Sequence, residues 1–158
     1  MARMEYVDID SANDRVKELL DKLEHKNIFR MLAHSPSHFE TYVRMGNAIR
    51  FKGELDPGLR ELAITRAGIL CKSEYEIIAH KRIGKGVGLD DTKIGALESG
   101  ADSDAYDDLE KDVLRFTDEI VKSDSVSDEL FHRLQATLSP GAVVELTLAV
   151  GCYIMTSN

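Results

Sequence analysis

The chain is poor in cysteine, proline and tryptophan, and each shortage excludes a class of protein. Its 158 residues include two cysteines, three prolines and no tryptophan. Cys71 and Cys152 are too few for a disulfide framework or a zinc ligand set. No uninterrupted apolar run reaches the roughly 18 residues of a membrane helix, and the N-terminus lacks the apolar core of a signal peptide. We therefore expect a cytoplasmic protein with no membrane partner.

A basic surface is also missing. The chain has 20 Lys and Arg against 28 Asp and Glu, a net charge of −8 at pH 7. Residues 102–129 hold 11 acidic and 3 basic residues, so the whole excess lies in this segment. Nucleic-acid binding depends on basic groups that displace counterions, and we expect no such partner. The simplest interpretation of the acidic segment is a solvated helix face, and an interaction surface is the alternative.

The spacing of apolar residues is helical throughout, and the two-residue alternation of strands is absent. Prolines follow good helix caps at Ser35-Pro36, Asp56-Pro57 and Ser139-Pro140, which marks three helix starts. With 43% hydrophobic residues, we expect an all-α chain that forms a single domain over residues 1–158. The expected helices are 11–24, 27–33, 36–51, 57–70, 73–87, 90–98, 104–122, 127–137 and 139–157.

A weak internal repeat relates two of these helix starts. Asp56-Pro57-Gly58 followed by Glu61-Leu62 resembles Ser139-Pro140-Gly141 followed by Glu145-Leu146, with one extra residue in the second copy. This pattern predicts a duplicated helical hairpin. The sequence ends where the second copy would begin its partner helix, so we expect a truncated chain or a last helix supplied from elsewhere.

One helix carries ionisable residues on its apolar face. At 100° per residue, Ser73, Glu76 and His80 of the helix 73–87 share that face. Glu76 and His80 are four residues apart and can pair directly. Glu61 of the preceding helix lies on the same face as Gly68, which allows close approach of a backbone or a ligand. Two carboxylates and a histidine on an apolar surface suit acid/base chemistry, and a buried structural pair is the alternative.

The stretch from Glu61 to His80, with the following Arg82-Ile83-Gly84, resembles the core motif of the carboxymuconolactone decarboxylase and AhpD-like superfamily. In AhpD-type reductases, a Glu precedes a Cys-x-x-Cys pair, and a His follows the second Cys by four residues. Here Ser73 and Glu76 occupy the two thiol positions, so no disulfide can form between them. The Glu–His spacing is instead similar to that of the decarboxylase branch.

The resemblance implies an AhpD-like helical bundle with a cofactor-free decarboxylase activity on a small carboxylated lactone or a similar organic acid. It implies a protein without a metal or a cofactor. It also implies a homo-oligomer, either a trimer or a hexamer. The site residues that we predict on this basis are His80, Glu76 and Glu61 as catalytic groups, and Ser73, Tyr75 and Cys71 as substrate-binding groups.

Two other functions remain open at this point. An AhpD-like alkyl hydroperoxide reductase would use Cys71 as a lone reactive thiol and would need an outside resolving thiol. A non-catalytic helical binding protein would keep the pocket without the chemistry. Cys71 is otherwise interpreted as a small buried side chain, and Cys152 as part of the core.

Overall fold

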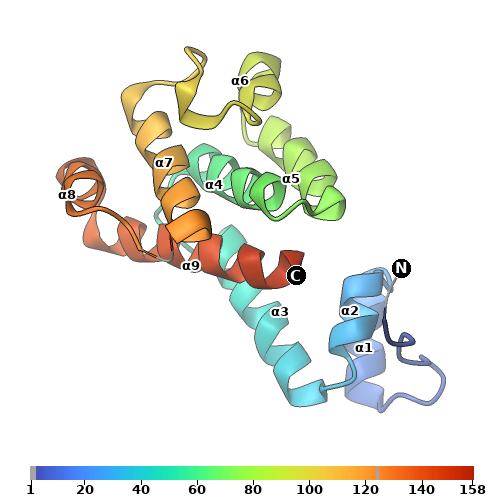
Figure 1. The fold of residues 1–158 in the computed structure, drawn as a ribbon. Helices are drawn as coiled ribbons and strands as arrows, with labels where there is room; N and C mark the ends of the chain where they lie inside the picture. Colours follow the sequence, from blue (N-terminus) through green and yellow to red (C-terminus); the bar gives the residue numbers. More distant parts are fainter. Residues whose placement is uncertain (1–2, 124) are drawn as a thin grey trace. The chain divides into compact units, whose positions relative to one another are not determined.

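The computed structural model describes residues 3–123 and 125–158, and all its regular secondary structure in those ranges is helical (Figure 1). This confirms the all-α prediction. The described helices are α1 (Asp14–Lys22), α2 (Asn27–Leu32), α3 (Pro36–Phe51), α4 (Pro57–Leu70), α5 (Glu74–Gly86), α6 (Asp91–Ala96), the 3₁₀-helix η1 (Gly100–Asp102), α7 (Asp108–Ser123), α8 (Asp128–Thr137) and α9 (Pro140–Ser157).

The helix boundaries follow local caps and turns. Asn13 caps α1 by accepting from the amide of Val16, so this helix begins later than the predicted residue 11. The helix α7 also begins later than the predicted residue 104, because Asp107 accepts from the amide of Glu110 and so starts the helix at Asp108. The three Ser/Asp–Pro pairs do precede helix starts, at α3, α4 and α9.

The chain divides into two compact units, Met1–Ala48 and Ile49–Asn158. The core of the first unit consists of Val16, Leu19, Leu20, Ala33 and Phe39, and the rings of Phe29 and Phe39 lie 6.2 Å apart between their centroids. The expectation of a single domain over residues 1–158 stays a prediction.

In the second unit, α4 is the central helix. Its residues from Leu59 to Gly68 are all buried, and α4 packs against α5, α7 and α9. Figure 1 shows α4 between these helices. Asp56 starts the helix by accepting from the amides of Gly58 and Leu59, and Pro57 fills a position that needs no donor. A helix enclosed on all sides must satisfy any polar side chain it carries, and this applies to Glu61.

A tight connection folds α5 back onto α4. Lys72 adopts a left-handed conformation, with φ of 59°, and the amide of Ser73 donates to the carbonyl of Gly68. A Cβ at Gly68 would lie 3.2 Å from the Cβ of Glu76, so glycine permits the close approach of the two helices. This hairpin brings Glu76 and His80 against α4.

The second copy of the repeat uses its glutamate differently. Glu145 of α9 accepts from the backbone amides of Glu54 and Leu55, just before α4. In return, Glu54 accepts from the hydroxyl of Ser139, the N-cap of α9. Hydrogen bonds therefore join α9 to the segment before α4, and that segment to the N-cap of α9. Glu145 has this structural role, whereas its counterpart Glu61 contacts a histidine.

The helix α9 is long and apolar enough on average to cross a membrane, although the sequence has no uninterrupted apolar run of that length. Length and composition alone are weak evidence, because core helices of soluble proteins pass the same test. One face of α9, including Leu146 and Val150, is fully buried in the core of the second unit. Glu145 forms hydrogen bonds at that unit's backbone. We therefore describe α9 as a core helix.

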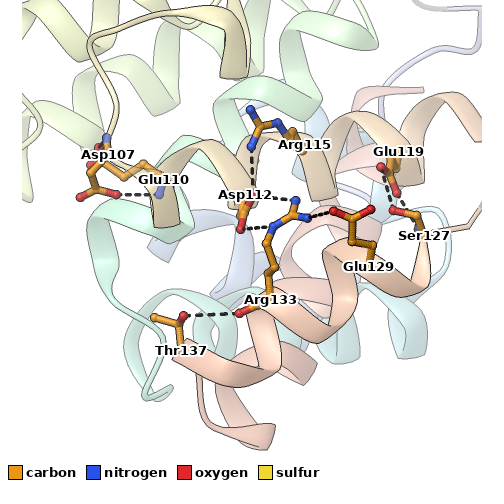
Figure 2. A network of polar contacts seen from close by, with 9 residues as sticks. All are labelled: Asp107, Glu110, Asp112, Arg115, Glu119, Ser127, Glu129, Arg133 and Thr137. Carbon is orange, nitrogen blue, oxygen red and sulfur yellow. Dashed lines mark hydrogen bonds and ion pairs between the residues drawn. The ribbon is translucent and has the colours of Figure 1, made fainter.

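The acidic segment is only partly the solvated face that the sequence suggested. Glu110 and Asp112 are buried, and Asp118 is mostly buried. Asp112 pairs with Arg115 and with Arg133 of α8, as Figure 2 shows. The prediction was wrong for these carboxylates, because they face neighbouring helices and neutralise cations there. Arg133 also holds exposed Glu129, and Glu119 accepts from Ser127.

Candidate active site

A carboxylate–imidazole–carboxylate triad connects α4 and α5. His80 Nδ1 lies 2.6 Å from Glu61 Oε2, and His80 Nε2 lies 3.4 Å from Glu76 Oε2. All three side chains are buried, and Glu61 is 0% exposed. The predicted apolar face of α5 is thus the face that carries buried Glu76, His80 and Gly84. The closer partner of His80 is Glu61 from the other helix, not Glu76 from its own.

The two contacts suit a protonated imidazole. With an ionised carboxylate as its partner, Nδ1 is the donor of the shorter contact, because a carboxylate only accepts. In the imidazolium form, Nε2 also carries a proton, on the side that faces Glu76 Oε2. Burial lowers the pKa of His80, but the hydrogen bonds and charges of Glu61 and Glu76 together outweigh it, and the net pKa is raised. The triad can therefore hold an imidazolium in an apolar interior and release its proton at Nε2.

Two further residues contact the triad, and neither was among the site residues predicted from the sequence. Arg60 Nε donates to Glu61 Oε1 at 3.1 Å, and Arg60 is itself buried. The ring of Tyr153 from α9 lies edge-on to His80, with 4.6 Å between ring centroids. The first contact depends on the side-chain conformation of Arg60. The second joins helices that are far apart in the sequence, α5 and α9. A sequence signal for Arg60 did exist, since a buried glutamate calls for a nearby cation.

The three predicted substrate-binding residues lie at the start of α5 and at the turn before it. Ser73 is the N-cap residue of α5, but its side chain makes no capping hydrogen bond. Cys71 is half-buried at the end of α4. Tyr75 is 53% exposed, and no described contact joins it to the triad. Their role in binding a substrate stays a prediction.

Neither thiol resembles an activated one. Burial raises the pKa of Cys71. The pKa of Cys152 is also raised, first by burial and then by the charge of Glu76, against the opposing hydrogen bond of Thr156. Cys152 is buried, as predicted for a core residue. A reactive cysteine requires a lowered thiol pKa. Both thiols have a raised pKa instead, so neither is activated.

Two other arginines of α4 and α5 have different surroundings. Arg66 donates to both carboxylate oxygens of Asp118 and to the carbonyls of Leu97 and Glu98. Arg82 is exposed on α5. In residues 3–123 and 125–158, no group of three or more His, Cys, Asp and Glu side chains is arranged to hold a metal ion.

Solved structures define the fold class first. A peroxidase-related protein from Ralstonia eutropha JMP134, described as an alkylhydroperoxidase AhpD core, aligns with a TM-score of 0.82 and 16% identity over 98% of this chain and 86% of its own. A peroxidase-related protein from Silicibacter sp. TM1040 aligns with a TM-score of 0.80 and 15% identity over 99% of this chain and 90% of its own. An Agrobacterium tumefaciens protein of unknown function, suggested to be the antioxidant defence protein AhpD, aligns with a TM-score of 0.71 and 22% identity over 80% of this chain and 87% of its own. This chain therefore has the AhpD-like helical fold.

The family follows from the sequence. Residues 36–119 match the model of the carboxymuconolactone decarboxylase family, and this chain belongs to that family. The matched range includes all three triad residues and Arg60. No curated protein sequence matches the chain significantly.

Proposed function

We propose that this protein is a cofactor-free acid/base enzyme, a carboxy-lyase that removes CO₂ from a small carboxylated lactone or a similar organic acid. One observation supports the proposal above all: a buried imidazole held between two carboxylates, with no activated thiol beside it. Such an arrangement supplies a proton at a fixed place in an apolar interior. Membership of the decarboxylase family supports the same reaction class.

In the proposed reaction, the bond between the substrate carboxylate and its carbon breaks, and CO₂ leaves. The electron pair of that bond stays on the carbon as an enolate conjugated with the lactone. The proton at His80 Nε2, shared with Glu76, is then transferred to the carbon. Glu61 keeps the imidazole in the required tautomer through Nδ1 and stabilises its protonated form. Water later returns a proton to His80.

A thiol peroxidase is the second candidate, because the solved neighbours are described as peroxidase-related. Two features oppose it: Ser73 and Glu76 stand at the thiol positions of the AhpD-type motif, and burial raises the pKa of Cys71. Replacement of Cys71 by serine separates the candidates. Loss of hydroperoxide consumption in Cys71→Ser, with normal consumption in Cys152→Ser, would establish the thiol route.

The test of the main proposal measures CO₂ release from 4-carboxymuconolactone by the intact protein. His80→Ala should lose release by roughly 10²-fold or more, the usual contribution of a general acid. Glu74→Gln, on the exposed side of α5, is the matched control and should retain it. Release that is equal in wild type and His80→Ala would remove His80 from the chemistry. Absence of release in every form, together with no hydroperoxide consumption, would favour a non-catalytic binding protein.

We further propose that the protein assembles with copies of itself, as a trimer or a hexamer. Val144, Leu148 and Met155 of α9 are large apolar side chains that are exposed in the single chain, and their spacing places them on one face. Light scattering during gel filtration measures the assembly. Leu148→Glu should lower the mass of the particle, whereas a monomeric wild type would contradict self-association.

A further inference from the structure

Arg60 has a property that the proposed reaction requires and that no other described cation near the triad provides. It is 8% exposed, and its Nε bonds Glu61 Oε1 at 3.1 Å. Among the residues that the structure describes, no hydrogen-bond partner faces its Nη1 or Nη2 atoms. A guanidinium is always charged, and its two terminal nitrogens form a planar fork that matches a carboxylate. The unused side of Arg60 is therefore suited to an organic anion.

The position of Arg60 connects this anion to the reacting group. Only the carboxylate of Glu61 separates the guanidinium from the imidazole of His80, since Oε1 bonds Arg60 and Oε2 bonds His80. A second negative group of a substrate could thus be held on the Glu61 side while the proton lies on the opposite side of the imidazole, at Nε2. Arg66 is unsuited to this task, because its guanidinium is already bonded to Asp118 and to two carbonyls.

We propose that Arg60 binds a carboxylate of the substrate through its Nη1 and Nη2 atoms. This inference rests on the proposed acid/base function and adds the anchoring group that selects the substrate. The substrate class is then an organic acid that keeps one carboxylate on Arg60 throughout the reaction. A neutral substrate would leave the buried cation paired on one side only, and it would bind more weakly.

The electrostatics of the site sharpen this selection. The groups that contact His80 are Glu61 from α4, Glu76 from its own helix and Tyr153 from α9, with Arg60 bonded to Glu61 and Cys152 near Glu76. Arg60 is the only cationic side chain in that set of described neighbours. An anion that approached on the Glu76 side would meet a carboxylate whose one ion pair among the described residues is with His80. Binding of a carboxylate at the triad therefore depends on Arg60.

Binding of an unreactive probe tests the proposal without turnover. The probe is γ-carboxy-γ-butyrolactone, a saturated lactone acid, and its uncharged methyl ester is the matched ligand; calorimetry measures both affinities. Wild type should prefer the acid by roughly tenfold to a hundredfold, as for a charge-assisted hydrogen bond. Arg60→Met should abolish the preference, and Arg60→Lys should restore part of it. Arg82→Met removes an exposed cation from α5 and should leave the preference unchanged.

Each result has a defined meaning. An equal affinity of wild type for acid and ester would overturn the proposal, as would a preference that survives in a folded Arg60→Met variant. Circular dichroism confirms that the variant folds, and Arg60→Lys supplies the answer if it does not. Arg60-dependent binding without any CO₂ release would leave the inference standing and remove the decarboxylase function. CO₂ release with an unchanged KM in Arg60→Lys and Arg60→Met would leave the decarboxylase function standing and remove the role of Arg60 in binding.

Discussion

His80 Nδ1 and Glu61 Oε2 lie 2.6 Å apart, although 19 positions separate the two residues in the sequence. The contact exists because Gly68 and the tight turn after α4 allow α5 to approach closely. It joins an ionisable group to a helix that is buried on every side. A buried charge of this kind is stable only with partners, and His80 and Arg60 are the partners of Glu61.

The first prediction concerns the two carboxylates that hold His80. Both Glu61→Gln and Glu76→Gln should lower the pKa of His80, because each removes a negative charge that stabilises the imidazolium. The decrease should be larger for Glu61→Gln, since its contact is 2.6 Å against 3.4 Å. Nuclear magnetic resonance of the histidine ring measures the titration.

Glu74→Gln is the control for that measurement, since Glu74 is exposed on the same helix. It should leave the titration of His80 almost unchanged. A larger shift in Glu76→Gln than in Glu61→Gln would contradict the order of the two contacts.

The second prediction is the pH dependence of stability. The pKa of folded His80 lies above its usual value of 6.5, so its protonation stabilises the fold fully below that pH. This stabilisation is lost as the pH rises from 6.5 through the raised pKa. Urea unfolding at a series of pH values should therefore show a decline over that window in wild type. The decline should be smaller in His80→Gln, and identical slopes in the two proteins would contradict the raised pKa.

The sequence predicted most of the fold and part of the site, for identifiable reasons. Caps such as Asp56-Pro57 and Ser139-Pro140 are local signals: α4 begins at the predicted Pro57, and α9 begins at Pro140, one residue after its predicted start. The triad residues could be predicted from the sequence because Glu76 and His80 have helical spacing and Glu61 shares the apolar face of the preceding helix. Periodicity places side chains on one helix face in this way, but it does not reveal which helices meet.

Contacts between helices that are far apart in the sequence could not be predicted from it. Tyr153 reaches His80 only because α9 packs on α4, and no spacing in the sequence indicates that. Likewise, Asp118 belongs to a segment that reads as a solvated acidic face, yet it pairs with Arg66 of α4, 52 positions away. Composition describes the charge of a segment and not the cations that other helices direct toward it.

The third prediction tests this buried ion pair. Asp118→Asn leaves the guanidinium of Arg66, whose side chain is 8% exposed, without its carboxylate partner. Loss of one partner of such a pair costs roughly 3 kcal/mol in the free energy of unfolding. Glu129→Gln removes one partner of an exposed pair with Arg133 and should cost much less. Chemical denaturation of both variants gives the comparison, and equal losses would show that Arg66 and Asp118 do not act as a buried pair.

The fourth prediction concerns Gly100, which lies close to the same guanidinium. Its φ is +62°, a conformation that other residues adopt at a cost, and an added Cβ would lie 2.8 Å from Arg66 Cζ. Gly100→Ala should therefore lower the free energy of unfolding by about 2 kcal/mol. Gly95→Ala, in α6 with open space around it, should instead stabilise the protein by up to about 1 kcal/mol. Thermal unfolding of the two variants should shift in opposite directions, and a Gly100→Ala variant as stable as wild type would mean that Arg66 can move away from η1 without losing its hydrogen bonds.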